Sequence, residues 1–204
     1  MKKENTMKRH TAKLKEDLIQ TGVEEIKNHG IDKVSLRTIA KACGVTHETP
    51  YKHFESKEMY LKAVLAHLSD FCSSQMTQNL DLNAPARQQL LQLGLNVVTF
   101  AQVHPYVFEA LFIKYPFNYM EMTENTIVTT SQLSGFHDFK QCVVKLRQEE
   151  NLLGSEAETL VHFWSFISGL GILVKSPLGD NFSYQMLPDM IEQMLSIYIK
   201  GGQL

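Results

Sequence analysis

The sequence predicts an all-α protein of about nine helices, in which a small N-terminal domain leads through one long helix into a larger helical domain. Apolar residues recur three and four positions apart along most of the chain, which is the period of amphipathic helices. Glycine, proline and small polar clusters separate these stretches and mark turns between helices. No stretch carries the alternating pattern and tight turn of a β-hairpin, so the sequence favours a bundle of helices.

The composition is typical of a folded protein in a reducing compartment. Of the 204 residues, 44% are hydrophobic, which is enough to build a core. The three cysteines, Cys43, Cys72 and Cys142, are odd in number and lie far apart in apolar surroundings. They indicate reduced thiols and predict neither a disulfide framework nor a zinc site.

Targeting signals are not expected. Residues 1–10 are polar and basic with no apolar run behind them, which argues against a signal peptide. The longest apolar run, residues 161–174, is interrupted by His162, Ser165 and Ser168 and is too short to span a bilayer. We therefore expect a cytoplasmic protein, and nothing in the sequence indicates a cofactor or a metal.

The charge is distributed unevenly along the chain. Residues 1–62 hold 13 Lys and Arg against 9 Asp and Glu, a net charge of +4. Residues 63–204 hold 7 against 13, a net charge of −6. A basic end on an acidic body suits a protein that presents one end to a polyanion, although an imbalance of this size also arises by chance.

The first segments differ in their periodicity. Residues 1–10 lack an apolar period and are predicted to form a flexible basic arm. A helix is expected over residues 12–28, where apolar residues follow the helical period and His29-Gly30 ends the pattern.

Two short helices are then predicted within residues 34–57. Ser35 and Thr46 are typical N-cap residues. Gly44 lies between them, at a position where helices often end with a positive φ. The small side chain of Ala40 lets a second helix, residues 46–54, cross the first closely. This is the pattern of a helix-turn-helix unit, whose second helix can enter the major groove of DNA.

Ser56 is expected to cap a fourth helix over residues 57–80, which would join the two domains without a flexible linker. The predicted division is therefore 1–10, 11–60 and 61–204. In the last of these, periodicity predicts further helices over residues 86–103, 106–115, 120–150, 156–174 and 187–200.

The stretch around residues 34–57 resembles the N-terminal DNA-binding domain of TetR/AcrR-type transcriptional repressors. The resemblance rests on His29-Gly30, on S-L-R-T-I-A-K-A-C-G-V from Ser35, and on Thr46, Thr49, Y-K-H-F and S-K-E. It covers about the first quarter of the chain strongly. It implies a three-helix helix-turn-helix domain on a helical domain that binds an effector and forms a homodimer, and no enzymatic activity.

The resemblance and the docking geometry of such motifs indicate which side chains would contact DNA. Residues early in the second helix would approach base edges, an arginine on the preceding helix could reach guanine or phosphate, and the following polar residues would hold phosphates. For Tyr51, half-burial against the long helix is the alternative. The predicted DNA-binding residues are Arg37, Thr46, His47, Thr49, Tyr51, Lys52, His53 and Lys57.

Two residues depart from the family pattern. Glu48 places an acid on the surface expected to face DNA, where phosphates repel it unless a cytosine amine donates to it. Pro50 occupies a site usually held by a larger apolar residue, in the first turn of a helix where its missing N–H costs little.

Aromatic and methionine residues gather in the second domain. In a regulator of this shape they would enclose a pocket for a flat, apolar or cationic effector, although most such residues are expected to be core and a lone histidine is more often structural. The predicted pocket residues are Phe100, His104, Phe108, Phe112, Tyr115, Met120, His162 and Phe166.

The run W-S-F-I-S-G-L from Trp164 resembles the W-x-x-x-H-G segment of one TetR subgroup, with Ser168 in place of the histidine. With the last helix it suits a symmetric four-helix contact, and packing within one chain is the alternative. The predicted dimer residues are Trp164, Ser168, Gly169, Met190, Met194, Ile197 and Tyr198.

The sequence thus predicts a homodimeric regulator, most simply a repressor that releases an inverted-repeat operator when a small, largely apolar effector binds. A helical scaffold that has lost affinity for DNA stays open as an alternative, because of Glu48. No Ser/His/Asp set, phosphate loop or metal spacing supports an enzyme.

Overall fold

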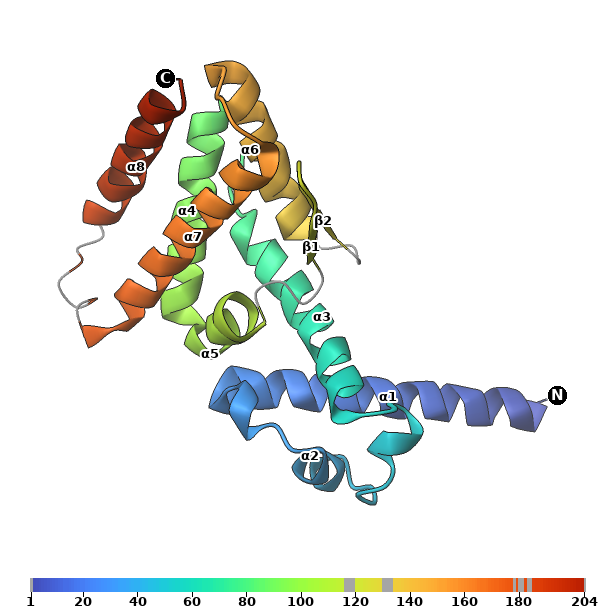
Figure 1. The fold of residues 1–204 in the computed structure, drawn as a ribbon. Coiled ribbons are helices and arrows are strands. Elements are labelled where there is room, and N and C mark those ends of the chain that lie inside the picture. The colour runs from blue at the N-terminus through green and yellow to red at the C-terminus, as the bar shows by residue number, and fades with distance from the viewer. Residues whose placement is uncertain are drawn as a thin grey trace.

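The computed structural model describes residues 2–115, 120–129, 134–177, 179, 182 and 185–203. These residues form eight α-helices, two short 3₁₀ helices, one π-helical segment and a two-stranded hairpin (Figure 1). The predicted all-α class is confirmed, and the small sheet is its one departure in the described part of the chain.

The N-terminal elements gather at one end of the molecule, below the bundle in Figure 1. They are α1 (Lys2–His29), η1 (Ile31–Lys33), α2 (Leu36–Ala42) and η2 (Pro50–Lys52). We call these elements, with the first turns of α3 (Lys57–Met76), the head. The helix α3 then runs from the head into the bundle (Figure 1), as the predicted joining helix should.

The remaining elements form what we call the body. They are α4 (Ala86–Val103), α5 (Pro105–Phe108), the π-helix η3 (Glu109–Lys114), β1 (Met120–Met122), β2 (Ile127–Thr129), α6 (Ser134–Glu150), α7 (Glu156–Lys175) and α8 (Met186–Gly202).

The head is held together where α1 crosses α3. Leu18 and Ile26 of α1 and Ile39 of α2 are buried there. The Tyr60 ring is fully buried, and its hydroxyl donates to the Leu18 carbonyl over 2.8 Å. Burial, and after it the charges of Cys43 and Glu25, raise the pKa of Tyr60. Tyr60 therefore stays a neutral hydrogen-bond donor throughout the physiological range.

The ends of the head helices match the sequence in part. Gly44 has φ +68°, and the Val45 N–H donates to the Ala40 carbonyl, so the predicted glycine turn is confirmed. The Ser56 hydroxyl accepts from the Met59 N–H at the start of α3, as expected. Ser35 holds the N-cap position of α2 but its side chain makes no cap bond. The first helix starts at Lys2, so residues 2–10 lie within it and do not form a separate arm.

Helix α4 is the centre of the body, packed against α3, α6, α7 and α8. Leu90, Leu93, Val97 and Val98 are buried along it, in agreement with a pattern that is apolar nearly all round. By length and composition α7 is, within the described ranges, the one helix that could cross a membrane, and core helices of soluble proteins pass the same test. It packs against α4 and α6.

The segment that follows η3 differs from the prediction of one helix over residues 120–150. Here β1 pairs antiparallel with β2, with Met120 opposite Thr129. The Thr123 hydroxyl accepts from the Thr126 N–H and donates to its carbonyl, which closes the turn. A run of β-branched residues in β2 favours a strand over a helix. Helix α6 begins only at Ser134, so Ser134-Gly135 lies at the start of a helix and not within one.

Candidate functional site

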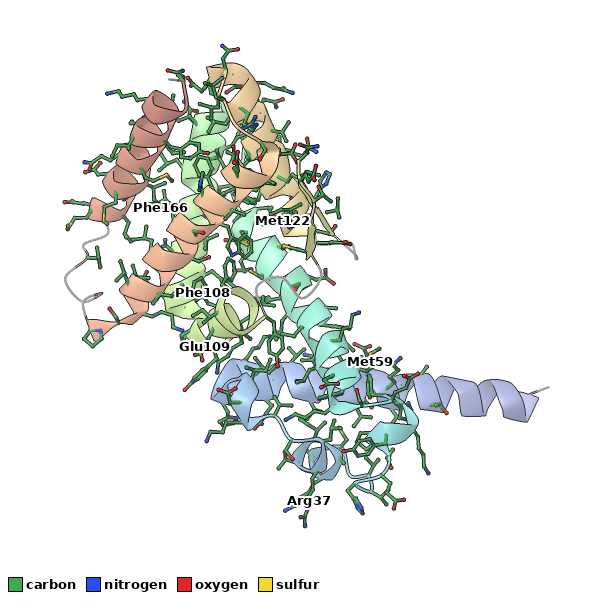
Figure 2. All side chains as sticks on the ribbon, viewed as in Figure 1. Arg37, Met59, Phe108, Glu109, Met122 and Phe166 are labelled. Carbon is green, nitrogen blue, oxygen red and sulfur yellow. The ribbon has the colours of Figure 1, made fainter. Side chains whose placement is uncertain are left out.

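The exposed face of the head carries the side chains predicted to contact DNA. Figure 2 labels Arg37 at the tip of the head that is farthest from the body. The residues Arg37, Thr46, His47, Tyr51, Lys52 and Lys57 are exposed, and Thr49 and His53 are half-buried. All eight are thus accessible to a partner in some degree.

Tyr51 is 56% exposed, which argues against half-burial on the long helix. Its neighbours fill that role instead, because Pro50 and Phe54 are buried and the Phe54 ring meets Tyr60 edge-on at 5.1 Å. The departure at Pro50 therefore serves the core of the head. Glu48 is exposed, so its charge does lie on the face with the cationic residues.

The second helix of the motif is shorter than predicted. In place of a helix over residues 46–54, residues 47–49 form a turn and Pro50–Lys52 a 3₁₀ helix. Proline has no N–H to donate to the Thr46 carbonyl, and that carbonyl accepts from the Thr49 N–H instead. The Thr46 and Thr49 hydroxyls lie 3.0 Å apart and share a hydrogen bond. These contacts fix the turn that carries His47 and Glu48.

Two groups at the edge of this face have defined electrostatics. Burial, assisted by the charge of Lys15, lowers the pKa of His53 below its ordinary value, so at neutral pH the ring is a neutral donor. Lys57 occupies the first position of α3, where its charge adds to the positive end of the helix dipole. Both features suit contacts with phosphate oxygens.

The body contains an apolar cavity of about 70 Å³ between α3, η3, the hairpin, α6 and α7. A second cavity of about 30 Å³ lies beside it, and the two share Met76, Phe112, Phe139 and Trp164 as walls. The rings of Phe108, Phe112 and Trp164 form a stack with centroid distances of 4.7 and 4.9 Å. The cavities are therefore bounded by a rigid aromatic wall.

The predicted pocket residues fall into three groups. Phe112, Tyr115 and Met120 line the first cavity, and Phe166 lines the second. Phe108 is buried in the aromatic stack and lines neither.

The other three predicted pocket residues lie elsewhere. Phe100 and His104 line a separate surface groove between α3 and α4, where His104 meets Phe71 edge-on. His162 is exposed, and its Nδ1 lies 3.1 Å from the Tyr198 hydroxyl. Helical periodicity does not show which face of a helix meets a cavity, so the sequence could not place His104 and His162 correctly.

Several lining residues were missed at the sequence level. They are Leu65, Ser69, Cys72, Ser73 and Met76 of α3, Leu111 of η3, and Phe136 and Phe139 of α6. The i, i+4 and i+7 spacing of Leu65, Ser69, Cys72 and Met76 places them on one face of α3, so the periodicity held the signal. From sequence alone such a helix face is expected to pack in the core, so these residues were not predicted to line a cavity.

The comparison with known proteins centres on the head. Residues 18–64 match the family model described as bacterial regulatory proteins, tetR family. The head thus carries the tetR-family pattern. The match runs from Leu18 in α1 to Val64 in α3 and so includes the exposed cationic face. The resemblance to the TetR family that the sequence predicted is confirmed over these residues.

Relatives and solved structures extend the likeness beyond the head. The probable acrEF/envCD operon repressor of Escherichia coli K12 is 28% identical over 127 residues, covering 59% of this chain and 56% of that protein. The chain thus matches about half the length of this curated relative. A protein of unknown function from Rhodococcus sp. RHA1 shares the fold with a TM-score of 0.64 at 17% identity, covering 92% and 94% of the two chains.

Two further solved structures agree. The TetR-family transcriptional regulator HI0893 of Haemophilus influenzae has a TM-score of 0.57 at 17% identity, covering 91% and 96% of the two chains. RolR in complex with resorcinol has a TM-score of 0.63 at 14% identity, covering 91% and 89%. At these identities the solved structures support the fold.

The residues predicted for a TetR-type dimer contact are spread over two faces of α7 and α8. Trp164 lines both cavities and Met194 lines the second, so these two point into the body. Tyr198 bonds His162, Met190 is half-buried, and Ser168 is half-buried with no hydrogen-bond partner for its hydroxyl among the described residues.

Gly169 and Ile197 lie on the outer surface. A Cβ at Gly169 would meet nothing within 4 Å, and Ile197 is 73% exposed. Ile172 and Leu173, which lie three and four residues after Gly169 on α7, are exposed as well. We call Gly169, Ile172, Leu173 and Ile197 the outer apolar face.

Proposed function

We propose that the chain is a DNA-binding transcriptional regulator, and specifically a repressor that releases an inverted-repeat operator when a small apolar effector enters the body. The observation that carries the proposal is the exposed cationic face of the head, within the residues that match the tetR family. The domain division at residues 11–60 and 61–204 is part of it, as is a cytoplasmic location.

The proposed roles of the head residues follow from their exposure. Arg37, His47 and Thr49 approach base edges, and Thr46 supports the turn through its bond to Thr49. Tyr51, Lys52, His53 and Lys57 hold phosphates, which positions the head on the duplex. Residues 2–10 form the N-terminal turns of α1 (Figure 1), and their sequence adds basic residues for contacts with the DNA backbone.

The proposed effector site is the pair of cavities in the body. Helix α3 forms one wall of the first cavity through Leu65, Ser69 and Cys72 and continues into the head, so a change in the cavity moves the head. The neighbouring fold of RolR was solved with resorcinol, which supports an aromatic effector at such a site.

A second connection joins cavity and head through η3. Leu111 and Phe112 of this π-helix line the first cavity. In the same segment the Lys114 Nζ lies 2.9 Å from Asp32 Oδ2 in η1, and Tyr106 of α5 packs against Gly30. A ligand that displaces Phe112 therefore acts on both contacts with the head.

A homodimer completes the proposal, because two heads are needed to bind the two halves of an inverted repeat. The outer apolar face is the surface we assign to the contact. The alternative of a scaffold that no longer binds DNA rests on Glu48 alone, and the following experiment decides between them.

Purified protein is expected to bind a duplex from upstream of its own gene more tightly than a random duplex, with an affinity that falls as salt rises. Tyr51→Ala should lower that affinity at least about tenfold, and Lys57→Gln should reduce the slope of log affinity against log salt by about one. Fluorescence anisotropy over a salt series measures both. Equal affinity for the two duplexes would refute the regulator.

Lys200→Gln is the matched control, because Lys200 is exposed at the end of α8, far from the head (Figure 1). It removes the same charge as Lys57→Gln and should leave the slope unchanged. Size-exclusion chromatography should give each variant the same oligomeric state as the parent, so that any loss belongs to the DNA contact.

A further inference from the structure

The cavity walls contain no ionised side chain. None of the described residues that line either cavity is Asp, Glu, Lys, Arg or His. Residues 116–119 and 130–133, which adjoin lining residues in the sequence, contain none of these either. A charged ligand would lose its hydration in such a site without gaining a partner of opposite charge.

The α3 wall of the cavity also disfavours negative charge. Burial raises the pKa of the Cys72 thiol to about 12. The thiol donates instead to the Met76 sulfur over 3.5 Å. The wall therefore keeps its own ionisable group neutral.

The aromatic wall suits a flat molecule. Phe108, Phe112 and Trp164 are stacked with interplanar angles of 13°, and Phe136 and Phe139 direct their edges at Trp164. These rings line the site with both flat surfaces and edges. An aromatic ligand gains from both stacked and edge-on contacts with such a group.

Two hydroxyl groups lie on the α3 side of the first cavity. Ser69 and Ser73 are four residues apart on α3 and face the same way. The Ser73 Oγ accepts from the Gly135 N–H at 2.8 Å, so its own hydrogen stays available to a ligand. The Ser69 hydroxyl has no hydrogen-bond partner among the described residues. One edge of the cavity can therefore bond a single polar group.

The cavity volume limits the size of the ligand. About 70 Å³ is about half the volume of the ~150 Å³ cavity that binds benzene, so a single ring is the upper limit and enters only when a side chain of the wall moves. The second cavity, across the shared wall, gives room for a short alkyl substituent once Phe112 or Met76 shifts.

We propose that the ligand of the first cavity is an uncharged, planar, single-ring aromatic compound with one hydrogen-bonding group directed at Ser69 and Ser73. The claim that this ligand is the effector rests on the proposed function. The claim that the ligand binds in the cavity does not. We expect cationic compounds, which aromatic walls can also attract, to bind more weakly, because none of the described lining residues is a carboxylate.

Four probes of similar size test the assignment: para-isopropylphenol, para-isopropylbenzoate, para-isopropylbenzylammonium and para-isopropylcyclohexanol. Trp164 is the only tryptophan in the chain and lines the cavity, so its fluorescence reports binding there directly. We expect the phenol to change the emission and to raise Tm. We expect the anion, the cation and the non-planar alcohol to bind at least about tenfold more weakly.

Variants on α3 test the polar edge. Ser69→Ala should weaken the phenol about fivefold and leave para-isopropyltoluene, which lacks the hydroxyl, unaffected. Ser74→Ala is the matched control, because the Ser74 hydroxyl is exposed and donates to the Phe71 carbonyl of its own helix. It should bind all probes like the parent protein.

The outcomes separate ligand class from function. Equal binding of the phenol and either ion, equal binding of the alcohol, or no response to any probe would overturn the assignment. If the phenol binds but operator DNA stays bound at saturation, the ligand class holds and effector release fails. If a charged probe releases the DNA instead, regulation holds and our ligand class is wrong.

Discussion

Replacing Gly22 with alanine is expected to destabilise the head by about 2–4 kcal/mol. A Cβ at this position would overlap the Tyr60 hydroxyl and lie 2.8 Å from Val64 Cγ2. The Tyr60 ring is fully buried and bonded to Leu18, so it has no free rotamer to adopt. Either α1 moves away from α3 or the buried hydrogen bond breaks, and urea denaturation followed by circular dichroism measures the loss.

Gly201→Ala is the control for this change. Gly201 lies in the last turn of α8, and a Cβ there would meet nothing within 4 Å. Alanine has the higher helix propensity, so this variant should be as stable as the parent or slightly more stable. Equal stability of Gly22→Ala and Gly201→Ala would show that α1 and α3 do not cross as closely as described.

Ile197→Glu is expected to convert the proposed dimer to monomer, weakening association at least about a hundredfold. Ile197 is the most exposed large hydrophobic residue of the described part of the chain, at 73%. The substitution costs the free monomer little, but a dimer through the outer apolar face would bury an unpaired carboxylate. Operator affinity should fall with it, because a single head binds only one half-site. Analytical ultracentrifugation and anisotropy measure the two effects.

Leu82→Glu provides the matched control, since Leu82 is 66% exposed in the loop between α3 and α4. It adds the same charge to an exposed leucine away from α7 and α8. It should leave both the dimer and operator binding unchanged. A dimer that survives Ile197→Glu would move the contact to another surface.

Local sequence signals predicted the helix ends well where one residue decides the backbone. Gly44 was expected at a positive φ and has it, and Ser56 was expected to cap the long helix and does. In both cases the deciding interaction lies within a few residues of the chain. Such interactions need no knowledge of the tertiary fold.

Predictions failed where neighbours far along the chain decide. The hairpin at residues 120–129 is held against α7 by the Ala157 N–H, which donates to the Asn125 carbonyl. Lys140 of α6 donates to the Ile127 carbonyl and holds it against that helix. Neither partner is visible in the periodicity of the segment itself. Trp164 is a similar case, because a small-residue helix face suggested a dimer contact while packing turned the ring into the cavity.

The candidate DNA-contacting residues of the head could be predicted from the sequence, but the residues that line the cavity mostly could not. The head residues follow from a motif in which spacing fixes exposure, and all eight are at least partly exposed. Periodicity in the body identifies which residues face inward, but not which of them pack tightly and which leave space. That distinction depends on side-chain volumes from several helices at once.

The contact between Lys114 and Asp32 has a consequence under the proposed function that concerns the order of events in a cell. Coupling free energies are reciprocal, so if ligand lowers the affinity for DNA through this contact and α3, DNA lowers the affinity for ligand by the same factor. Molecules that are off the operator then bind ligand first. As ligand accumulates, the unbound pool acts as a buffer, and it sets the concentration at which the operator becomes free.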